Sequence, residues 1–212
     1  MTTTELLSLF RSEVFDLETP YLWSDALIYG YIDEAQKQFC RQTHGIEDAR
    51  TYKLNIAVPT EWYAVNPKIL KLRGVIDQAT GLDVPLIPVE KMQQFGLRFD
   101  GTTGPLKALI TGLQKGYVRT YPIPSVASVA ELRTFRLPAD IAVGDDFEID
   151  DQHVRNLLFW VKHKAYSIPD TETYDAKASE KFKTAWDEYC AAALREQSRM
   201  RHTAGSVTYG GL

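Results

Sequence analysis

The hydrophobic period of this sequence changes twice along the chain. Up to about residue 50 the apolar residues recur every three or four positions, between 51 and 149 they tend to alternate, and from 150 to 200 the helical spacing returns. Spacings of three and four place side chains on one face of a helix, whereas alternation places them on one face of a strand. The sequence therefore predicts an α+β fold in which a β-rich region is inserted between helical segments.

Two amphipathic helices are expected in the first fifty residues. The first, over 3–15, would be capped by Thr3 or Thr4, because a hydroxyl oxygen can accept a hydrogen bond from an unpaired amide of the first turn. The second would be capped by Ser24. Gly30 lies inside this second helix and costs about 1 kcal/mol relative to alanine, which suggests that another backbone approaches it closely.

Two more helices are expected after Asp150, separated by the break "SIPD", with Asp170 or Thr171 as the cap of the second. Each has one apolar stripe, so the four helices are expected to form a single bundle. The first stripe consists of Val154, Leu157, Leu158, Val161 and Ala165, and the second of Tyr174, Ala178, Phe182, Ala185, Tyr189 and Ala193.

Between the helical segments, "YKLNIAV", "ILKLRGVID" and "AELRTFRLP" are predicted strands, and "EKMQQFG" is a predicted short helix. A hairpin is expected around "GLQKG", where Gly112 and Gly116 supply turn freedom. These strands predict a sandwich-like or barrel-like insertion. The predicted domains are a helical bundle of 1–50 with 150–200, a β-rich insertion of 51–149, and an extended docking tail of 201–212.

Charge and composition exclude several classes of protein. The net charge is −4 and the pI is near 5.6, which argues against a dedicated nucleic-acid binder with a basic face. The N-terminus lacks the pattern of a signal peptide, and a run of about 18 apolar residues is missing, so no membrane association is expected. Two cysteines far apart in sequence indicate a reduced chain made in the cytoplasm.

The candidates for catalysis or metal binding are weak, so no enzyme, metal or cofactor is predicted. The acidic cluster "GDDFEIDD" lacks the spacing of a calcium loop and is better explained as acids at a helix start, with Asp150 as the cap. The histidines lack metal-ligand spacing. Cys190 occupies a helix interior, where a free cysteine usually acts as a small buried apolar residue.

The predicted hairpin carries a candidate interaction face. Tyr117 and Tyr121 alternate with Val118 and Thr120, which gives one aromatic strand face, and Arg119 is expected on the other face with little reason to be buried. Packing within the hairpin is an alternative explanation.

The C-terminal segment is basic and rich in glycine, with Arg195, Arg199 and Arg201 against Glu196 alone in the last 22 residues. The arginines are either a solvated helix end, where cations suit the dipole, or part of an arm that becomes ordered on a partner. The second interpretation is favoured, because a glycine-rich tail that ends in Tyr209 and Leu212 has no evident use within one copy of the chain.

Four segments together resemble bacteriophage head-to-tail adaptor (connector) proteins of the portal-adaptor, tail-tubular type. They are "WSDALIYGYIDEAQKQFCRQT", "GYVRTYPIPSVASVAELRTFRLP", "LLFWVKHKAYSIPDTETYDAKASEKFKTAWDEY" and "RMRHTAGSVTYGGL". Their order and spacing carry the resemblance, which covers nearly the whole chain and is loosest between 60 and 105.

This resemblance implies a structural virion protein that assembles in the host cytoplasm, typically as a twelve-subunit ring beneath the portal. Such a ring extends the channel through which DNA passes without specific binding, and it offers a platform to the tail or nozzle. The C-terminal segment would dock to the portal through Arg195, Arg199, Arg201, His202, Tyr209 and Leu212. A ring needs two different faces on each subunit, and the candidates are Leu27, Tyr31, Tyr117, Arg119 and Tyr121.

Three alternatives stay open. The chain is another ring component of the neck or tail, a metal-dependent hydrolase that uses Asp146 and Asp150, or a DNA-binding module that uses the arginine tail.

Overall fold

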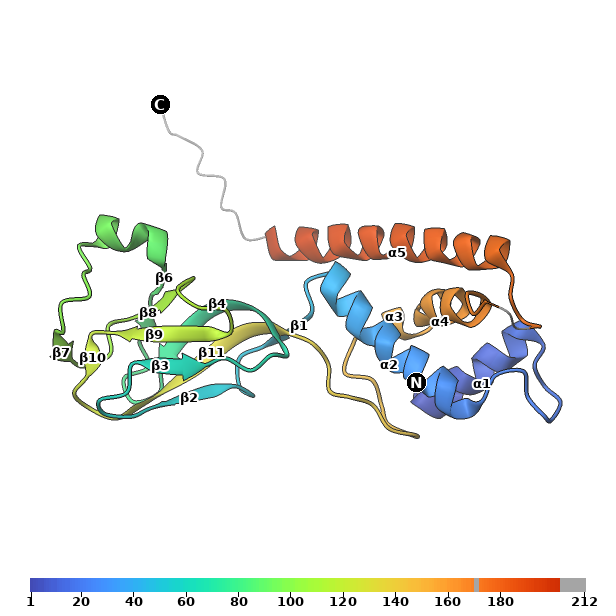
Figure 1. Ribbon diagram of the computed structural model, residues 1–212, viewed down its shortest axis with the longest axis horizontal. Coiled ribbons are helices and arrows are strands. Elements are labelled where there is room, and N and C mark those ends of the chain that lie inside the picture. The colour runs from blue at the N-terminus through green and yellow to red at the C-terminus, as the bar shows by residue number, and fades with distance from the viewer. Residues whose placement is uncertain (170–171, 203–212) are drawn as a thin grey trace, which may run out of the picture. The chain divides into compact units, whose positions relative to one another are not determined.

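The computed structural model describes residues 1–169 and 172–202, and the chain divides into two compact units (Figure 1). One unit combines residues 1–45 with residues 138–169 and 172–202 and is helical. The other consists of residues 46–137 and is built from strands. Helices and sheets therefore occupy separate parts of the chain, and the fold is α+β.

The helical unit contains five α-helices within the described residues, and they pack around a shared apolar core. The helices are α1 (Thr3–Val14), α2 (Asp25–Gln42), α3 (Asp151–Val154), α4 (Leu157–Tyr166) and α5 (Ala176–His202). The largest core side chains are Leu6, Phe10, Trp23, Ile28, Ile32, Phe39, Leu157 and Trp186. Rings from α2, α4 and α5 meet in this core, where Trp186 lies 6.4 Å from Phe39 and 5.5 Å from Trp160 between ring centroids.

The caps of α1 and α2 test the sequence predictions directly. Ser24 caps α2 as predicted, since its hydroxyl accepts from the amide of Leu27. The prediction for α1 is wrong, because Thr2 is the cap and forms a reciprocal capping box with Glu5. Thr3 is instead buried, and its hydroxyl donates to the carbonyl of Ala142 at 3.0 Å.

Two further details of the helices differ from expectation. A Cβ added at Gly30 would meet nothing within 4 Å in the described part of the chain, so no close backbone explains this glycine. In α5 the buried residues are Ser179, Trp186, Cys190 and Ala193. Ala193 is buried as predicted, and the other predicted residues of the helix are half-buried beside this stripe. Tyr174 lies before the helix and is exposed, so its predicted place in the stripe is wrong.

The start of α5 has its own capping interaction. The Asp175 carboxylate accepts from the amides of Lys177 and Ala178 at 2.9 and 3.0 Å, as an N-cap does. The predicted caps, Asp170 and Thr171, lie outside the described residues.

The strand unit contains two larger sheets and one parallel pair of short strands, β7 (Thr103–Gly104) and β10 (Ile123–Pro124). One larger sheet has the order β1-β11-β4-β5, and β2 also pairs with β11. Its strands are β1 (Ile46–Asp48), β2 (Lys53–Ile56), β4 (Ile69–Asp77), β5 (Asp83–Val84) and β11 (Ser128–Arg136). The other has the order β3-β9-β8-β6, with β3 (Trp62–Ala64), β6 (Leu86–Pro88), β8 (Ala108–Thr111) and β9 (Tyr117–Tyr121).

Both larger sheets contribute to one apolar core. Leu54, Val75 and Leu132 come from the first sheet, and Leu109 and Val118 come from the second. The arrangement is that of two sheets facing each other across a core. Within residues 46–137, all of which are described, no sheet closes into a barrel, so the barrel-like form of the prediction does not apply.

The predicted hairpin is confirmed. Strands β8 and β9 pair antiparallel, and Gly112 and Gly116 adopt φ of 86° and 78°, a region that disfavours side chains. The predicted short helix is present as a 3-10 helix, η1 (Val89–Phe95), which ends at Gly96 with φ of 65°.

Candidate interaction surfaces

Strand β9 presents one face to the larger core, and its other face is only partly open, because Tyr121 packs against a smaller apolar cluster that includes Met92 and Ile110. Val118 and Thr120 are both 2% exposed, whereas Tyr117, Arg119 and Tyr121 lie on the opposite face. The prediction that Arg119 sits apart from the two tyrosines is therefore wrong. Residues two apart on a strand point the same way, so all three odd-numbered residues share the outer face.

Arg119 lies at the centre of this outer face. Its Nε donates to the Glu61 carboxylate at 2.7 Å, which forms a charge-assisted pair. The guanidinium carbon also lies 3.9 Å from the centroid of the Phe99 ring and 5.6 Å from that of Trp62. An ion pair and two cation–π contacts thus hold the side chain in place.

The arginine–aromatic patch is defined here as the group of Trp62, Phe99, Tyr117, Arg119 and Tyr121. Trp62 lies opposite Arg119 in the pairing of β3 with β9, and Phe99 approaches from the segment after η1. Trp62, Phe99 and Tyr117 are all exposed to a similar extent. Trp, Tyr and Arg are the residues that most often anchor protein–protein contacts.

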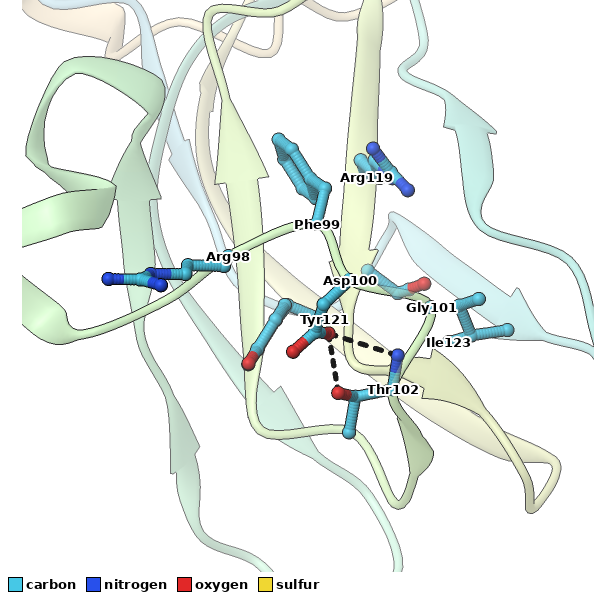
Figure 2. A pocket seen from close by; sticks show the side chains of 9 residues that line it. Arg98, Phe99, Asp100, Gly101, Thr102, Arg119, Tyr121 and Ile123 are labelled. Atoms are coloured by element: carbon cyan, nitrogen blue, oxygen red, sulfur yellow. Dashed lines mark hydrogen bonds between the residues drawn. The ribbon is translucent and has the colours of Figure 1, made fainter.

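A small recess borders the patch (Figure 2). In its wall, the Asp100 carboxylate accepts from the amide and the hydroxyl of Thr102 at 3.1 and 2.5 Å. These bonds to Thr102 lower the pKa of Asp100. The recess has a volume of about 10 Å³, room for about one water molecule. This recess is therefore too small to hold a drug-sized molecule.

The predicted interface residues of α2 are partly covered within their own unit. Leu27 and Tyr31 are half-buried. The amino group of Lys164 lies 5.8 Å from the centroid of the Tyr31 ring and pairs with Glu34 at 3.3 Å. Burial, and then the neighbouring Glu34, raise the pKa of Tyr31. This flank of α2 therefore leaves less apolar surface exposed than the sequence suggested.

The predicted portal-docking residues fall at the end of α5 and beyond it. Arg195 and Arg199 are exposed on α5, and Nε of Arg195 donates to the carbonyl of Ala191 at 3.0 Å. Arg201 and His202 occupy the last two positions of the helix. Tyr209 and Leu212 lie outside the described residues.

The acidic cluster supports the backbone of the segment before α3. Carboxylates of Asp145 and Glu148 accept from the amides of Ala142 and Ala139, each at 2.7 Å, and Asp151 pairs with the amino group of Met1 at 3.1 Å. Asp150 occupies the N-cap position of α3, although its side chain makes no capping bond within the described structure. Across residues 1–169 and 172–202, no three His, Cys, Asp or Glu side chains form a group that could hold a metal ion.

The buried titratable groups serve the helical core. Nδ1 of His153 lies 2.7 Å from the Tyr189 hydroxyl, and His163 contacts Ser179 on α5. Burial raises the pKa of the Cys190 thiol to about 12. A thiol with such a pKa is a poor nucleophile at neutral pH.

Sequence reasoning missed two surface features. The first is the contribution of Trp62, Phe99 and Glu61 to the arginine–aromatic patch, which depends on a long-range pairing of β3 with β9. The second is the α1–α2 loop, defined here as residues 15–22, which exposes Phe15, Leu17 and Leu22. The available signal was the series of apolar residues in "FDLETPYL" between two predicted helices.

Comparison with models of protein families shows which family the chain belongs to. The family model described as SU10 adaptor protein matches residues 1–208. The chain therefore belongs to the SU10 adaptor protein family, which consists of structural bacteriophage adaptors and is not an enzyme family. A comparison with curated proteins gave no match. In the part of the chain that the structure describes, no helix has the length and apolar character needed to span a membrane.

Proposed function

We propose that this adaptor assembles as a ring beneath the portal, where it connects the capsid to the tail and extends the DNA channel. The family match over residues 1–208 carries the proposal, because a structural phage adaptor is consistent with a role in the neck. The exposed arginine–aromatic patch supports it, since such surfaces suit contacts between proteins.

The proposed ring contains about twelve copies of the chain, the number that the resemblance to portal adaptors implies. A closed ring is built from heterologous contacts, in which one surface of each copy meets a different surface of the next. Tyr117, Arg119 and Tyr121 of the patch are proposed on one side of this contact. Leu27 and Tyr31 are proposed as a smaller contribution, since both are half-buried and Lys164 lies over the Tyr31 ring.

The C-terminal segment is proposed as the portal-docking arm. Arg195 and Arg199 provide exposed cations on α5, and the predicted arm continues through Arg201 and His202 to Tyr209 and Leu212. Arginine suits this role because its planar guanidinium can pair with carboxylates at a protein interface.

The charge of the chain suits passage of DNA. A net charge of −4 avoids the many phosphate contacts that make DNA binding tight and salt-dependent. DNA is thus expected to slide through the proposed channel without specific binding.

Cosedimentation with portal rings of the same phage tests the docking arm. A chain that ends at Gln197 should lose binding and keep the helical content of the full chain. Arg199→Glu should weaken binding, whereas Lys181→Glu, a matched change of an exposed cation elsewhere on α5, should not. Full binding by the shortened chain would contradict the docking arm.

A second candidate is another ring component of the neck or tail that binds a different partner. The same cosedimentation separates the two, because a chain that binds purified tail or nozzle protein but not portal rings would favour this candidate.

A further inference from the structure

The α1–α2 loop exposes three large apolar side chains within eight residues of sequence. Phe15 is 86% exposed and Leu17 is 64% exposed, and Leu22 is exposed at the other end of the loop. Isolated exposed apolar residues are common on protein surfaces, but a cluster of large ones often marks an interaction site. The segment connects the helices labelled α1 and α2 in Figure 1.

Buried polar contacts hold this loop in one conformation. The Arg11 guanidinium donates to the Asp16 carboxylate at 2.5 Å and to the carbonyl of Trp23 at 2.9 Å. The other oxygen of Asp16 accepts from the amide of Leu22 at 2.9 Å, and the ring of Tyr21 stacks 3.6 Å from Arg11. Both ends of the loop are thereby fastened to α1, so the exposed side chains are presented on a pre-organised backbone.

The conformation of Phe15 adds an independent observation. This residue ends α1 with φ of 57° and ψ of 30°, in the left-handed region where glycine is the usual choice. A bulky aromatic residue in this region carries a cost of about 1–2 kcal/mol. Glycine would avoid this cost, so Phe15 is better explained by a contact outside the single chain than by the folding of α1.

The arginine–aromatic patch has the complementary character. It offers exposed rings from Trp62, Phe99 and Tyr117, which suit the apolar side chains of the loop. Its rim includes the exposed Arg98, and the loop includes the exposed Glu18. Arg98 lies near Asp100 and attracts it electrostatically, but neither Arg98 nor Glu18 forms a close ion pair within the described residues, so the two can pair with each other across a contact.

We infer that the α1–α2 loop of one copy docks on the arginine–aromatic patch of a second copy of this chain. The inference rests on the ring proposed above and names the two surfaces that meet in it. The two surfaces differ and belong to different units, so their contact is heterologous and leaves each copy able to bind one neighbour on each side.

Disulfide trapping between two single-cysteine variants tests this contact. Leu17→Cys is mixed with Phe99→Cys under mild oxidation, with and without portal rings. The native Cys40 and Cys190 are buried and should not react. The control is Leu82→Cys mixed with Phe99→Cys, because Leu82 is a leucine of similar exposure, 68%, in a different place. At least about tenfold more heterodimer from Leu17→Cys supports the inference, and equal yields overturn it.

Substitution of Phe15 separates assembly from folding. Phe15→Gly should leave α1 intact and stabilise the helical unit, while it weakens self-association by at least about tenfold. Glu18→Arg should weaken association too, and Arg98→Glu in the partner copy should restore it. If rings form unchanged with Phe15→Gly, the inferred loop contact is wrong, but the proposed ring assembly is still supported. A chain that never associates, alone or with portal rings, overturns both.

Discussion

Arg11 and Asp16 form a buried ion pair at 2.5 Å, with side-chain exposures of only 8% and 2%, at the point where α1 ends and the α1–α2 loop begins. Asp25 also pairs with Arg11, so one arginine joins the end of α1, the loop and the start of α2. A charge buried to this extent depends on its partners, because its own hydration has been lost.

The first prediction concerns this pair. Asp16→Ala should lower the free energy of unfolding of the helical unit by about 3 kcal/mol, because it leaves Arg11 buried with less compensation. Denaturant unfolding followed by helical circular dichroism measures the change. Glu18→Ala, two residues on and exposed, should change the same quantity by less than about 0.5 kcal/mol. Similar values for the two variants would mean that the ion pair does not hold the loop.

The second prediction concerns Gly30. Gly30→Ala should stabilise the isolated chain by about 1 kcal/mol, because alanine is the better helix former and its Cβ meets nothing within 4 Å among the described residues. Gly112→Ala should have the opposite effect, since Gly112 adopts φ of 86° and sits in the turn of the hairpin. Thermal unfolding of both variants checks the prediction, and a destabilised Gly30→Ala would reveal a close neighbour of this face.

A third prediction concerns His153, whose pKa is lowered below 6.5 mainly by burial, while Asp150 and Glu196 oppose the shift. Phe39 and Tyr189 pack against its ring. The folded state therefore favours the neutral imidazole. This preference costs no stability well above pH 6.5, but stability falls as the pH drops below 6.5 toward the folded pKa, because the unfolded chain takes up the proton first.

Melting temperatures of the wild type and His153→Asn at pH 7.5 and pH 5.5 test this dependence. The decrease from pH 7.5 to pH 5.5 should be larger for the wild type, since the variant lacks the titrating ring. Equal decreases would show that other groups account for the loss of stability in acid.

The fourth prediction concerns the cysteines. With its pKa raised to about 12 by burial, the Cys190 thiol should react with an aromatic disulfide reagent at pH 8 at least about a hundredfold more slowly than a free thiol. Cys40 is 1% exposed and should be protected as well. Both should react rapidly in denaturant. Fast labelling of the native chain would show that α2 and α5 separate readily.

Sequence periodicity predicted the buried face of α4, because its large apolar residues allow only one stripe. In α5 it identified Ala193 but placed most of the stripe one residue early, because alanines occur on several sides and the position of Trp186 against Phe39 and Trp160 decides which side is most buried. The cap of α1 was also misplaced, although Glu5, three residues after Thr2, is the sequence signature of a capping box. The tertiary bond of Thr3 to Ala142 is the part that the sequence does not reveal.

The candidate surfaces were harder to predict, because they too depend on tertiary contacts. Tyr117, Arg119 and Tyr121 can be identified from one hairpin, but Glu61, Trp62 and Phe99 join them only through the folding of distant segments. The exposure of Phe15 likewise follows from the buried Arg11–Asp16 pair, which the spacing of apolar residues does not reveal.

The most direct test of the proposed function is negative-stain electron microscopy of the purified chain mixed with portal rings of the same phage. An added ring-shaped layer is expected on one face of the portal, and it should be absent when the chain ends at Gln197. The proposed function would be contradicted if the portal rings stay bare and the chain remains monomeric. The chain must then be present at a concentration well above the one at which virions assemble.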